Sequence, residues 1–318
     1  MKLSVAICTY NGEFYLAEQL TSIAKQIIPI NEIILYDDQS TDNTLQIAQR
    51  MQAQGLPIKI YQNPQRLGFI DNFSQAIQAC TGDIIFLCDQ DDIWKENKVS
   101  VTLNYFQNNP QTLLTFSDGE LVDSIVQSLD CSLWQALPRY PKITPEFIDL
   151  LNNDWLTGAA CAFRRELIQY ALPLPKYWVH DAWLGIIAST FGNVIGIPEK
   201  LIYYRQHQKN QIGLKPPTLK IRVEKLICLA TTLHKDKLEK YHILLNYVPT
   251  DSLQRSYIMG KIHHLENRLN NKKVIGIFKE LFKGGYHKYA NGWISFFRDV
   301  ILLIVQTTHY ILQPFGSR

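Results

Sequence analysis

Three carboxylates stand within four residues at Asp89, Asp91 and Asp92, directly after the apolar run Ile84–Cys88. Carboxylates this close repel one another, so a folded chain keeps them together only where a positive charge compensates them. The usual compensation is a hard divalent cation, bound through one or two carboxylates and completed by substrate phosphates. Such a cation neutralises the charge that develops on a departing nucleoside diphosphate. The structural alternative is an acidic turn that caps a helix beginning near Ile93.

Two further polar clusters follow apolar runs nearer the N-terminus. The segment 9–12 (TYNG) follows the first run, and the segment 37–42 (DDQSTD) follows the second. In open sheets of parallel strands, ligands bind at the carboxyl ends of the strands. The three clusters therefore predict one binding cleft at a single edge of a sheet. Local capping is the alternative for Asp37, Ser40 and Asp42, and we favour it for Asp42.

The elements that position these clusters alternate between strands and helices. Five apolar runs predict strands: Leu3–Cys8, Glu32–Tyr36, Ile58–Tyr61, Ile84–Cys88 and Thr112–Phe116. Between them, apolar residues recur at helical spacing in the stretches 16–27, 45–51 and 69–80. Strands that are apolar on both faces indicate a mostly parallel sheet covered by helices, which is an α/β fold. For residues 120–213, where prolines are frequent, we expect short strands and loops that complete the cleft.

The charge is divided unevenly along the 318 residues. Residues 1–213 carry 15 Lys and Arg against 22 Asp and Glu, whereas residues 214–318 carry 17 against 7. The acidic part needs cations wherever it binds phosphate, and the basic part favours an anionic lipid surface or nucleic acid. A helical tail with a solvated lysine face is the plain alternative for the basic part.

The cysteines and the N-terminus favour a cytoplasmic protein. The six cysteines form no C-x-x-C pair, and several lie in apolar runs, where Cys usually packs as a small hydrophobe. This usage fits a reducing compartment. The apolar run that begins at Leu3 is shorter than a signal peptide requires, so we expect none. We predict a cytoplasmic location at the inner face of the plasma membrane.

The segments 5–12 (VAICTYNG), 37–42 (DDQSTD) and 82–92 (GDIIFLCDQDD), in this order and at this spacing, resemble glycosyltransferase family 2 of the GT-A fold. The resemblance covers about residues 1–213. It implies a Rossmann-like, mostly parallel central sheet flanked by helices, with a nucleotide-binding half (1–120) and an acceptor half (121–213). A basic helical extension over 214–318 would follow.

By this resemblance, the first strand ends form the nucleobase side of the cleft. Thr9 and Tyr10 would line the base pocket, and Asp38 would accept a hydrogen bond from the pyrimidine N–H. Asn11 and Glu13 would support the same nucleotide-sugar site. The implied donor is a dTDP- or UDP-sugar.

The resemblance also assigns the diphosphate and metal side of the site. Arg66 and Asn72 would flank the base or the diphosphate, and Asp89 would contact the ribose or the sugar. Asp91 would ligate the metal, Mg²⁺ or Mn²⁺, with Asp92 as a further contact. The small-residue stretch 155–163 (WLTGAACAF) would border the acceptor and the sugar, or it serves tight packing alone.

A one-step displacement at an anomeric carbon needs a base that takes the proton of the acceptor hydroxyl. The family places an acidic pair near the position of His180-Asp181, and the first member here departs from Glu. The resemblance therefore implies Asp181 as the catalytic base, with His180 orienting it or touching the sugar. The alternative is that Asp181 caps a helix over 182–189.

The polar segment 203–213 (YYRQHQKNQIG) resembles the closing motif of the family. By that resemblance, His207 would complete the metal site and Arg205 would face the diphosphate. The Gln-His-x-x-Asn pattern is similar to that of bacterial rhamnosyltransferases that extend surface polysaccharide. It implies dTDP-L-rhamnose as donor and a glycan or lipid-linked glycan as acceptor.

The window 293–312 is the most apolar of the chain, and lysines precede it. Arg298, Asp299, Gln306 and His309 interrupt it, which argues against a helix spanning a bilayer. We expect peripheral membrane contact through residues 272–312. Packing on the catalytic domain and a dimer contact are the alternatives.

Other functions fit the sequence less well. A nucleotidyltransferase would carry a Gly- and Lys/Arg-rich phosphate loop after the first strand, where this chain has TYNGE. An inactive sugar-binding or scaffold protein would lack carboxylates, yet Asp38, Asp89, Asp91 and Asp181 are all present. No nucleic-acid partner is expected, because the basic and aromatic residues of the tail follow no recognisable module.

Overall fold

The computed structural model describes residues 1–207, 238–270 and 274–301, apart from residues 291, 294 and 298. Residue contacts divide the chain into two compact units, Met1–Leu214 and Lys215–Arg318. The predicted boundary at 213/214 and the residues 208–213 of the polar segment lie outside the described residues.

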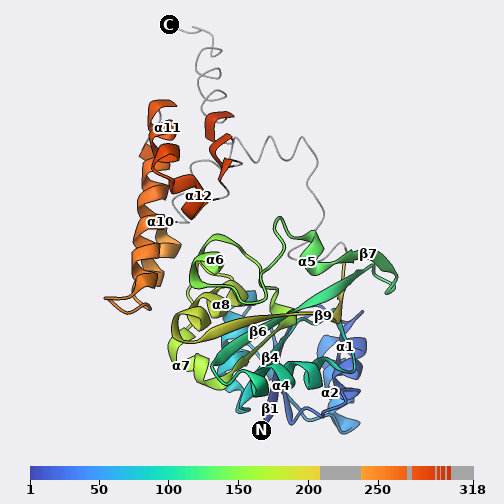
Figure 1. Cartoon of the computed structure of the whole chain (residues 1–318). Helices are drawn as coiled ribbons and strands as arrows, with labels where there is room; N and C mark the ends of the chain where they lie inside the picture. Colours follow the sequence, from blue (N-terminus) through green and yellow to red (C-terminus); the bar gives the residue numbers. More distant parts are fainter. Residues whose placement is uncertain (208–237, 271–273, 291, 294, 298, 302–318) are drawn as a thin grey trace, which may run out of the picture. The chain divides into compact units, whose positions relative to one another are not determined.

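The first unit is built on one mixed sheet with the strand order β3-β2-β1-β4-β8-β6-β9-β5, and β7 pairs with β6 (Figure 1). Its strands are β1 (Leu3–Thr9), β2 (Glu32–Asp37), β3 (Ile58–Gln62), β4 (Ile84–Cys88), β5 (Ile93–Trp94), β6 (Thr112–Val122), β7 (Ser128–Ser132), β8 (Cys161–Arg164) and β9 (Asn193–Arg205). The strands β3, β2, β1 and β4 run parallel, as does the pair β6–β9, whereas β8 is antiparallel to both β4 and β6. The predicted α/β fold is confirmed.

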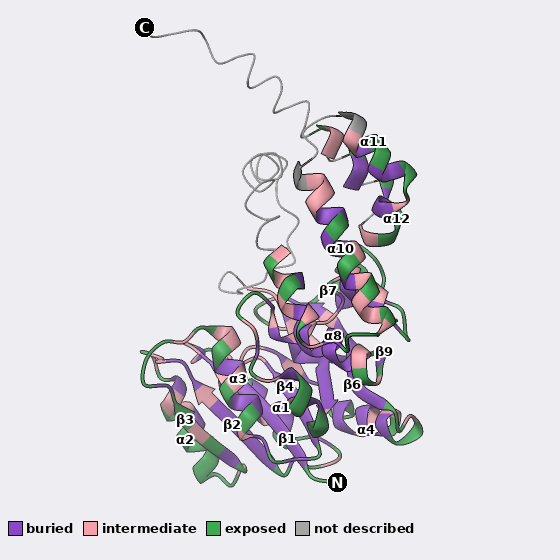
Figure 2. Cartoon of the chain, turned by 90° about the vertical axis from the view of Figure 1, so that its left-hand side faces the viewer, coloured by how far each residue is buried: buried purple, intermediate pink, exposed green. Residues whose placement is uncertain are grey.

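Helices and short helical turns flank this sheet. They are α1 (Leu16–Ala24), α2 (Thr44–Ala53), α3 (Phe69–Ala79), α4 (Lys98–Asn108), α5 (Leu133–Ala136), α6 (Phe147–Asn152), the 3-10 turns η1 (Gly158–Ala160) and η2 (Arg165–Leu167), α7 (Ile168–Ala171) and α8 (His180–Phe191). Figure 2 shows buried strands between helices whose outward faces are exposed. The apolar periodicities over 45–51 and 69–80 mark real helices, and so does that over 16–27, although α1 ends at Ala24 and Ile27 is exposed.

All five predicted strands form, and their ends bring the polar clusters together. Thr9 of β1 pairs with Asp37 of β2, and Ile7 pairs with Cys88 of β4, so the ends of these strands are nearly level. The polar clusters that follow them are therefore neighbours at one edge, as predicted. The strands of the second half are longer than the sequence predicted. β6 extends to Val122, and β9 is a 13-residue strand where short strands and loops were expected.

The second unit contains α10 (Leu253–Asn270), α11 (Val274–Phe282) and α12 (Gly285–Tyr289). Residues 293–301 continue as helical turns at the positions that are described. A small core of Ile277, Leu281, Tyr286 and Phe296 joins α11, α12 and the turns over 293–301, and the ion pair between Arg268 and Asp299 links α10 to them. Within the described residues, no helix combines the length and the hydropathy that a bilayer span would need.

Candidate active site

The ends of β1 and β2 are joined through the buried carboxylate of Asp37. It accepts hydrogen bonds from the Thr9 hydroxyl at 2.9 Å and from the Ser40 backbone N–H at 2.9 Å. Thr9 is 1% exposed, and its carbonyl accepts from the Asp38 N–H. The Thr9 side chain is therefore buried behind the strand ends, and the prediction that it lines the base pocket is corrected.

Asp42 accepts a hydrogen bond from the Thr44 N–H at the start of α2, so the predicted local capping role of Asp42 is confirmed.

Asp38 organises the loop that follows β3. Its oxygens accept from the backbone N–H groups of Leu67 at 2.7 Å and Gly68 at 2.8 Å, and from the Asn63 amide at 2.9 Å. Two backbone donors and a side-chain amide fix the carboxylate, so the loop before α3 has one defined course. Recognition of a pyrimidine N–H by Asp38 stays a prediction.

The loop that Asp38 fixes presents Arg66 to Tyr10. The guanidinium carbon of Arg66 lies 3.9 Å from the centroid of the Tyr10 ring. Gln90 holds the Tyr10 backbone from the other side, accepting from its N–H at 2.9 Å and donating to its carbonyl at 3.1 Å. Arg66 and Tyr10 thus form an accessible pair of flat groups, the kind of surface on which a nucleobase stacks. Gln90 was missing from the predicted site residues.

Asn72 does not reach this surface, which corrects its predicted contact with the base or the diphosphate. Asn72 is buried on α3; its Nδ2 donates to the Tyr36 carbonyl at 3.0 Å and its Oδ1 accepts from Asn63 at 2.8 Å. It therefore supports Asn63, which in turn holds Asp38.

Asn11 and Glu13 bind the loop after β2. The side-chain oxygen of Asn11 accepts from the Thr41 N–H at 2.9 Å, and the Glu13 carboxylate accepts from the Asn43 amide at 2.7 Å. Both residues shape the base side of the cleft, and direct contact with a nucleotide-sugar stays a prediction for both.

The acidic segment after β4 does not cap a helix. Residues 93–94 form β5, and α4 begins only at Lys98 with Asn97 at its cap position, so the capping alternative is wrong. Burial, followed by the charges of Asp91 and Asp181, raises the pKa of Asp89 to about 7. Asp89 therefore lies within electrostatic reach of both the predicted metal ligand and the predicted base.

Asp92 is the most buried of the three carboxylates. One of its oxygens accepts from the Arg205 N–H at 3.0 Å, and the other has no hydrogen-bond partner among the described residues. Burial and the charges of Asp91 and Asp89 raise its pKa well above the usual range. Asp92 is thus a positioning residue behind Asp91, and its side chain does not face the cleft.

Asp91 and His207, the two predicted metal ligands, are brought together. The Asp91 Oδ2 lies 2.8 Å from the His207 Nε2, and the imidazole stacks on the Tyr15 ring with centroids 4.8 Å apart. Among the described residues, no group of three His, Cys, Asp or Glu side chains is arranged to hold a metal. A carboxylate and an imidazole fit Mn²⁺ or Mg²⁺ chemically, but such an ion would take its remaining ligands from a diphosphate and water.

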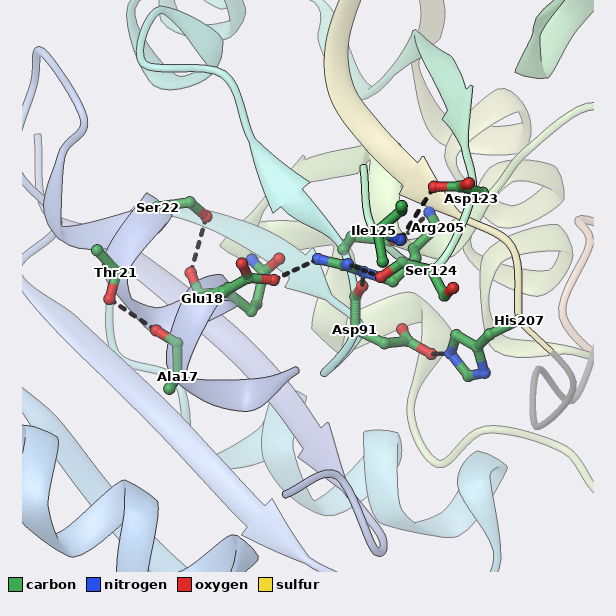
Figure 3. A network of polar contacts seen from close by, with 12 residues as sticks. Ala17, Glu18, Thr21, Ser22, Asp91, Asp123, Ser124, Ile125, Arg205 and His207 are labelled. Atoms are coloured by element: carbon green, nitrogen blue, oxygen red, sulfur yellow. Dashed lines mark hydrogen bonds and ion pairs between the residues drawn. The ribbon is translucent and has the colours of Figure 1, made fainter. Parts of the chain in front are cut away.

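Arg205 is a buried clamp, which corrects its predicted position facing the diphosphate (Figure 3). Its guanidinium donates to the Asp91 carbonyl at 2.8 Å, the Ser124 carbonyl at 2.7 Å and the Glu18 carboxylate at 2.6 Å. The side chain is 2% exposed and lies over the Tyr15 ring. Arg205 therefore ties α1, the acidic segment and the β6–β7 turn to the end of β9.

Asp181 lies in the first turn of α8. The helix begins at His180 with Val179 at the cap position, so Asp181 is not the N-cap residue of the alternative interpretation. Its Oδ2 accepts from the Gly158 N–H at 3.0 Å and its Oδ1 from the Ala182 N–H at 2.6 Å. Burial raises the pKa of its carboxyl group. A fixed carboxylate with a raised pKa suits a general base.

His180 does not orient Asp181 by a hydrogen bond. The ring is 6% exposed, stacks on Phe73 with centroids 4.1 Å apart, and neither nitrogen has a hydrogen-bond partner among the described residues. Burial lowers the pKa of its imidazole, which favours the neutral form. The predicted orienting role is corrected: His180 packs between α3 and the Gly158 turn.

The stretch 155–163 supports Asp181 through tight packing. A Cβ added to Gly158 would lie 2.4 Å from His180 Nε2, and the stacked ring has little room to yield. We expect Gly158→Ala to lower the free energy of unfolding by roughly 1–3 kcal/mol and to weaken the bond to Asp181. Thermal unfolding of Gly158→Ala, His180→Ala and the double variant measures the coupling. If the two single effects simply add in the double variant, the packing explanation is wrong.

Lys98 is a buried positive charge that the sequence analysis did not single out. Its ammonium donates to the Ala159 carbonyl at 3.3 Å and lies 5.0 Å from the Trp94 ring centroid. Burial lowers its pKa to about 8, while the nearby Asp92 acts in the opposite direction. Its sequence context, WKENK, looks like an ordinary solvated turn and carries no signal of this placement.

Carboxylates at the carboxyl ends of parallel strands, with a further carboxylate in the first turn of a later helix, fit a transferase of the nucleotide-sugar class. The chain belongs to glycosyltransferase family 2, whose family model (Glycosyl transferase family 2) matches residues 4–170. It is a glycosyltransferase that moves a sugar from a nucleotide-sugar donor.

Curated relatives agree with this assignment. An uncharacterized glycosyltransferase of Nostoc sp. is 28% identical over 222 residues, which cover 66% of this chain and 66% of the relative. An uncharacterized glycosyltransferase of Haemophilus influenzae is 24% identical over 320 residues, covering 87% and 96%. The dTDP-rhamnosyl transferase RfbG of Shigella flexneri is 28% identical over 231 residues, covering 65% and 73%.

Solved structures show the fold. Residues 1–349 of TarS from S. aureus, in complex with UDP-GlcNAc, align with a TM-score of 0.59 at 18% identity, covering 99% of this chain and 93% of that one. The mannosyltransferase PcManGT from Pyrobaculum calidifontis, in complex with GDP-Man and Mn²⁺, aligns with a TM-score of 0.54 at 17% identity, covering 98% and 81%. These similarities confirm the predicted GT-A fold.

Proposed function

We propose that this chain is an inverting, metal-dependent glycosyltransferase in which Asp181 is the catalytic base. The observation that carries the proposal is the Asp181 carboxylate, which the N–H groups of Gly158 and Ala182 hold at 3.0 and 2.6 Å in the first turn of α8. In this proposal Asp181 serves the attacking end of the displacement, and Asp91 with His207, 2.8 Å apart, serves the leaving-group end. Single displacement needs this separation, because the acceptor attacks from the side opposite to the departing diphosphate.

In this proposal each side chain has a separate task. Tyr10 and Arg66 hold the base, and Asp89 contacts the ribose or the sugar. Asp181 takes the proton of the acceptor hydroxyl as the new glycosidic bond forms and the bond to the nucleoside diphosphate breaks. Asp91 and His207 would hold a divalent cation, which supplies charge neutralisation for the diphosphate.

The metal assignment draws support from two sources. The Asp91–His207 contact of 2.8 Å joins an oxygen and a nitrogen ligand, and PcManGT, which shares the fold, was solved with Mn²⁺ and its donor. We expect Asp91→Asn to lose at least about tenfold in metal-dependent donor affinity, because the amide is a much weaker ligand than the carboxylate.

Thermal shift with a panel of nucleotide-sugars, with and without Mn²⁺, measures this effect. The exposed Asp130→Asn substitution on β7 is the matched control and should behave like the unmodified chain. Equal metal-dependent stabilisation of Asp91→Asn and Asp130→Asn would remove Asp91 from the metal site.

For the donor we propose dTDP-L-rhamnose, with a glycan or lipid-linked glycan as acceptor. The similarity to the dTDP-rhamnosyl transferase RfbG supports this choice. The competing donor is a UDP-hexose, which the UDP-GlcNAc complex of TarS favours. Turnover confined to UDP-hexoses in the same panel would overturn the rhamnose proposal and leave the glycosyltransferase assignment intact.

An inactive sugar-binding protein of the same fold is the remaining alternative. It would stabilise on donor binding but release no nucleoside diphosphate in the presence of any acceptor. The retained carboxylates Asp89, Asp91 and Asp181 favour the active enzyme.

A further inference from the structure

Among its described residues, the helical unit carries an apolar face that lies outside the small core of Ile277, Leu281, Tyr286 and Phe296. Trp293, Phe297 and Ile301 follow one another at a spacing of four residues, so they share one face of the helical turns over 293–301. They are 53%, 56% and 54% exposed. Phe278 and Phe282 of α11 repeat the same spacing, and Phe282 is 85% exposed. We call these five residues the aromatic face.

The two halves of the aromatic face belong to one surface. Phe278 contacts Phe296 at 5.1 Å between ring centroids, and Phe296 contacts Phe297 at 5.3 Å. Trp293 stacks on Phe297 at 5.9 Å. Phe296 is therefore the buried link between two exposed stripes. Contiguous exposed aromatic side chains are unusual on a soluble surface and mark a site of interaction.

The acidic side chains near the aromatic face are hydrogen-bonded inside the unit, whereas the lysines beside it are exposed. Glu280 is buried against His264 at 2.7 Å, and Asp299 binds the Arg268 guanidinium at 2.6 and 2.8 Å. Lys279 and Lys283 are exposed beside Phe278 and Phe282. The surface thus offers aromatic rings and ammonium groups, whereas the carboxylates of Glu280 and Asp299 are bound inside the unit.

We propose that the aromatic face docks on the surface of an anionic phospholipid bilayer. Aromatic rings enter the boundary between headgroups and acyl chains, and lysines beside them bind anionic headgroups. A second copy of the chain fits less well, since a two-fold interface through this face would bring Lys279 and Lys283 of both copies together. Of the predicted membrane contact over 272–312, residues 272, 273, 291, 294, 298 and 302–312 lie outside the described residues; within the described part, the proposal assigns the contact to five apolar side chains and their neighbouring lysines.

Sedimentation of the full chain with vesicles tests the proposal without any donor or acceptor. One set of vesicles contains phosphatidylcholine alone, and the other contains equal parts of phosphatidylcholine and phosphatidylglycerol. We expect binding to the anionic vesicles, at least about tenfold weaker binding to the neutral ones, and further weakening at high salt.

Two variants locate the binding to the aromatic face. Phe282→Ser combined with Phe297→Ser is expected to lower the vesicle partition coefficient at least about tenfold. Met259→Ser on α10 is the matched control, because Met259 is 57% exposed and lies outside the aromatic face. Thermal unfolding of each variant shows whether the unit still folds.

The outcomes separate the proposal from its alternatives. Equal binding of the double variant and the control would overturn it, and so would a concentration-dependent dimer that the double variant abolishes. An unmodified chain that ignores both kinds of vesicle would overturn it as well. None of these results depends on Asp181 or on the donor, so the proposed function is tested separately.

Discussion

Asp181→Asn is expected to abolish sugar transfer while donor binding stays at its normal affinity. The amide cannot take up the proton of the acceptor hydroxyl, and a positioned general base contributes about 100-fold to 10,000-fold in rate. The fold should tolerate the change, because an Asn oxygen still accepts a hydrogen bond from a backbone N–H of Gly158 or Ala182. Turnover with the best donor, together with calorimetric titration of that donor, measures both effects.

The matched control for this prediction is Asp154→Asn. Asp154 is an exposed carboxylate close enough to raise the pKa of Asp181. Its removal should leave turnover near neutral pH almost unchanged. Near-normal turnover of Asp181→Asn would assign the base to another residue, and loss of donor affinity in that variant would indicate a binding role instead.

We also expect the rate of sugar transfer to depend on pH through Asp181 and its neighbour Asp154. A general base works only when it is deprotonated, and burial raises the pKa of Asp181, so transfer should fall with decreasing pH at a higher pH than for an exposed Asp. Removing the negative charge of Asp154 stabilises the Asp181 carboxylate and lowers its pKa. We therefore expect the acidic limb of kcat to move to lower pH in Asp154→Asn. A limb that does not move would show that another group controls it.

The strands and the converging polar clusters could be predicted from the sequence because short-range patterns determine them. A run such as Ile84–Cys88 is apolar on both faces, and all five of its residues are buried. The parallel arrangement then places the next residues at a common edge. Asp91 and His207 were both predicted for the metal site and lie 2.8 Å apart, although only the family motif indicated His207.

The roles of Arg205 and His180 could not be predicted in the same way. Arg205 reaches Glu18 across 187 residues and the Asp91 carbonyl across 114. A motif shows that an arginine is present but not that three acceptors surround it. His180 stands where the family pattern has an acidic residue. The sequence does not show that the ring of Phe73 lies beside this position and stacks on the imidazole.

Two buried polar residues were also assigned to ligand binding from the sequence, although their side chains hydrogen-bond to other residues of the protein. Thr9 and Asn72 lie in motif positions beside the cleft, but their polar atoms bind Asp37, Asn63 and the Tyr36 carbonyl. A sequence does not distinguish a residue that lines a cleft from the residue behind it, because both sit within the same few positions. Burial makes the distinction, and burial depends on the packing of distant segments.

Arg205→Lys is expected to destabilise the acidic segment rather than to weaken a contact with the donor. A lysine keeps the positive charge but cannot donate to the Asp91 carbonyl, the Ser124 carbonyl and Glu18 at once, since its donors share one nitrogen. Leaving buried acceptors unpaired costs about 1–3 kcal/mol each, so we expect a loss of roughly 3 kcal/mol in unfolding free energy. The rate should fall with it, because Asp91 loses its backbone anchor.

The comparison with Glu18→Gln decides between the two roles of Arg205. The Glu18 side chain is 55% exposed, and glutamine keeps an acceptor oxygen, so this variant should reproduce only a small part of the loss. A positioning role requires that Arg205→Lys lowers both the melting temperature of the free protein and kcat. A residue that faces the diphosphate would instead leave the free protein as stable as before and raise the donor KM alone. The second pattern would restore the prediction made from the family motif, and the first would establish Arg205 as the clamp that fixes Asp91 beside His207.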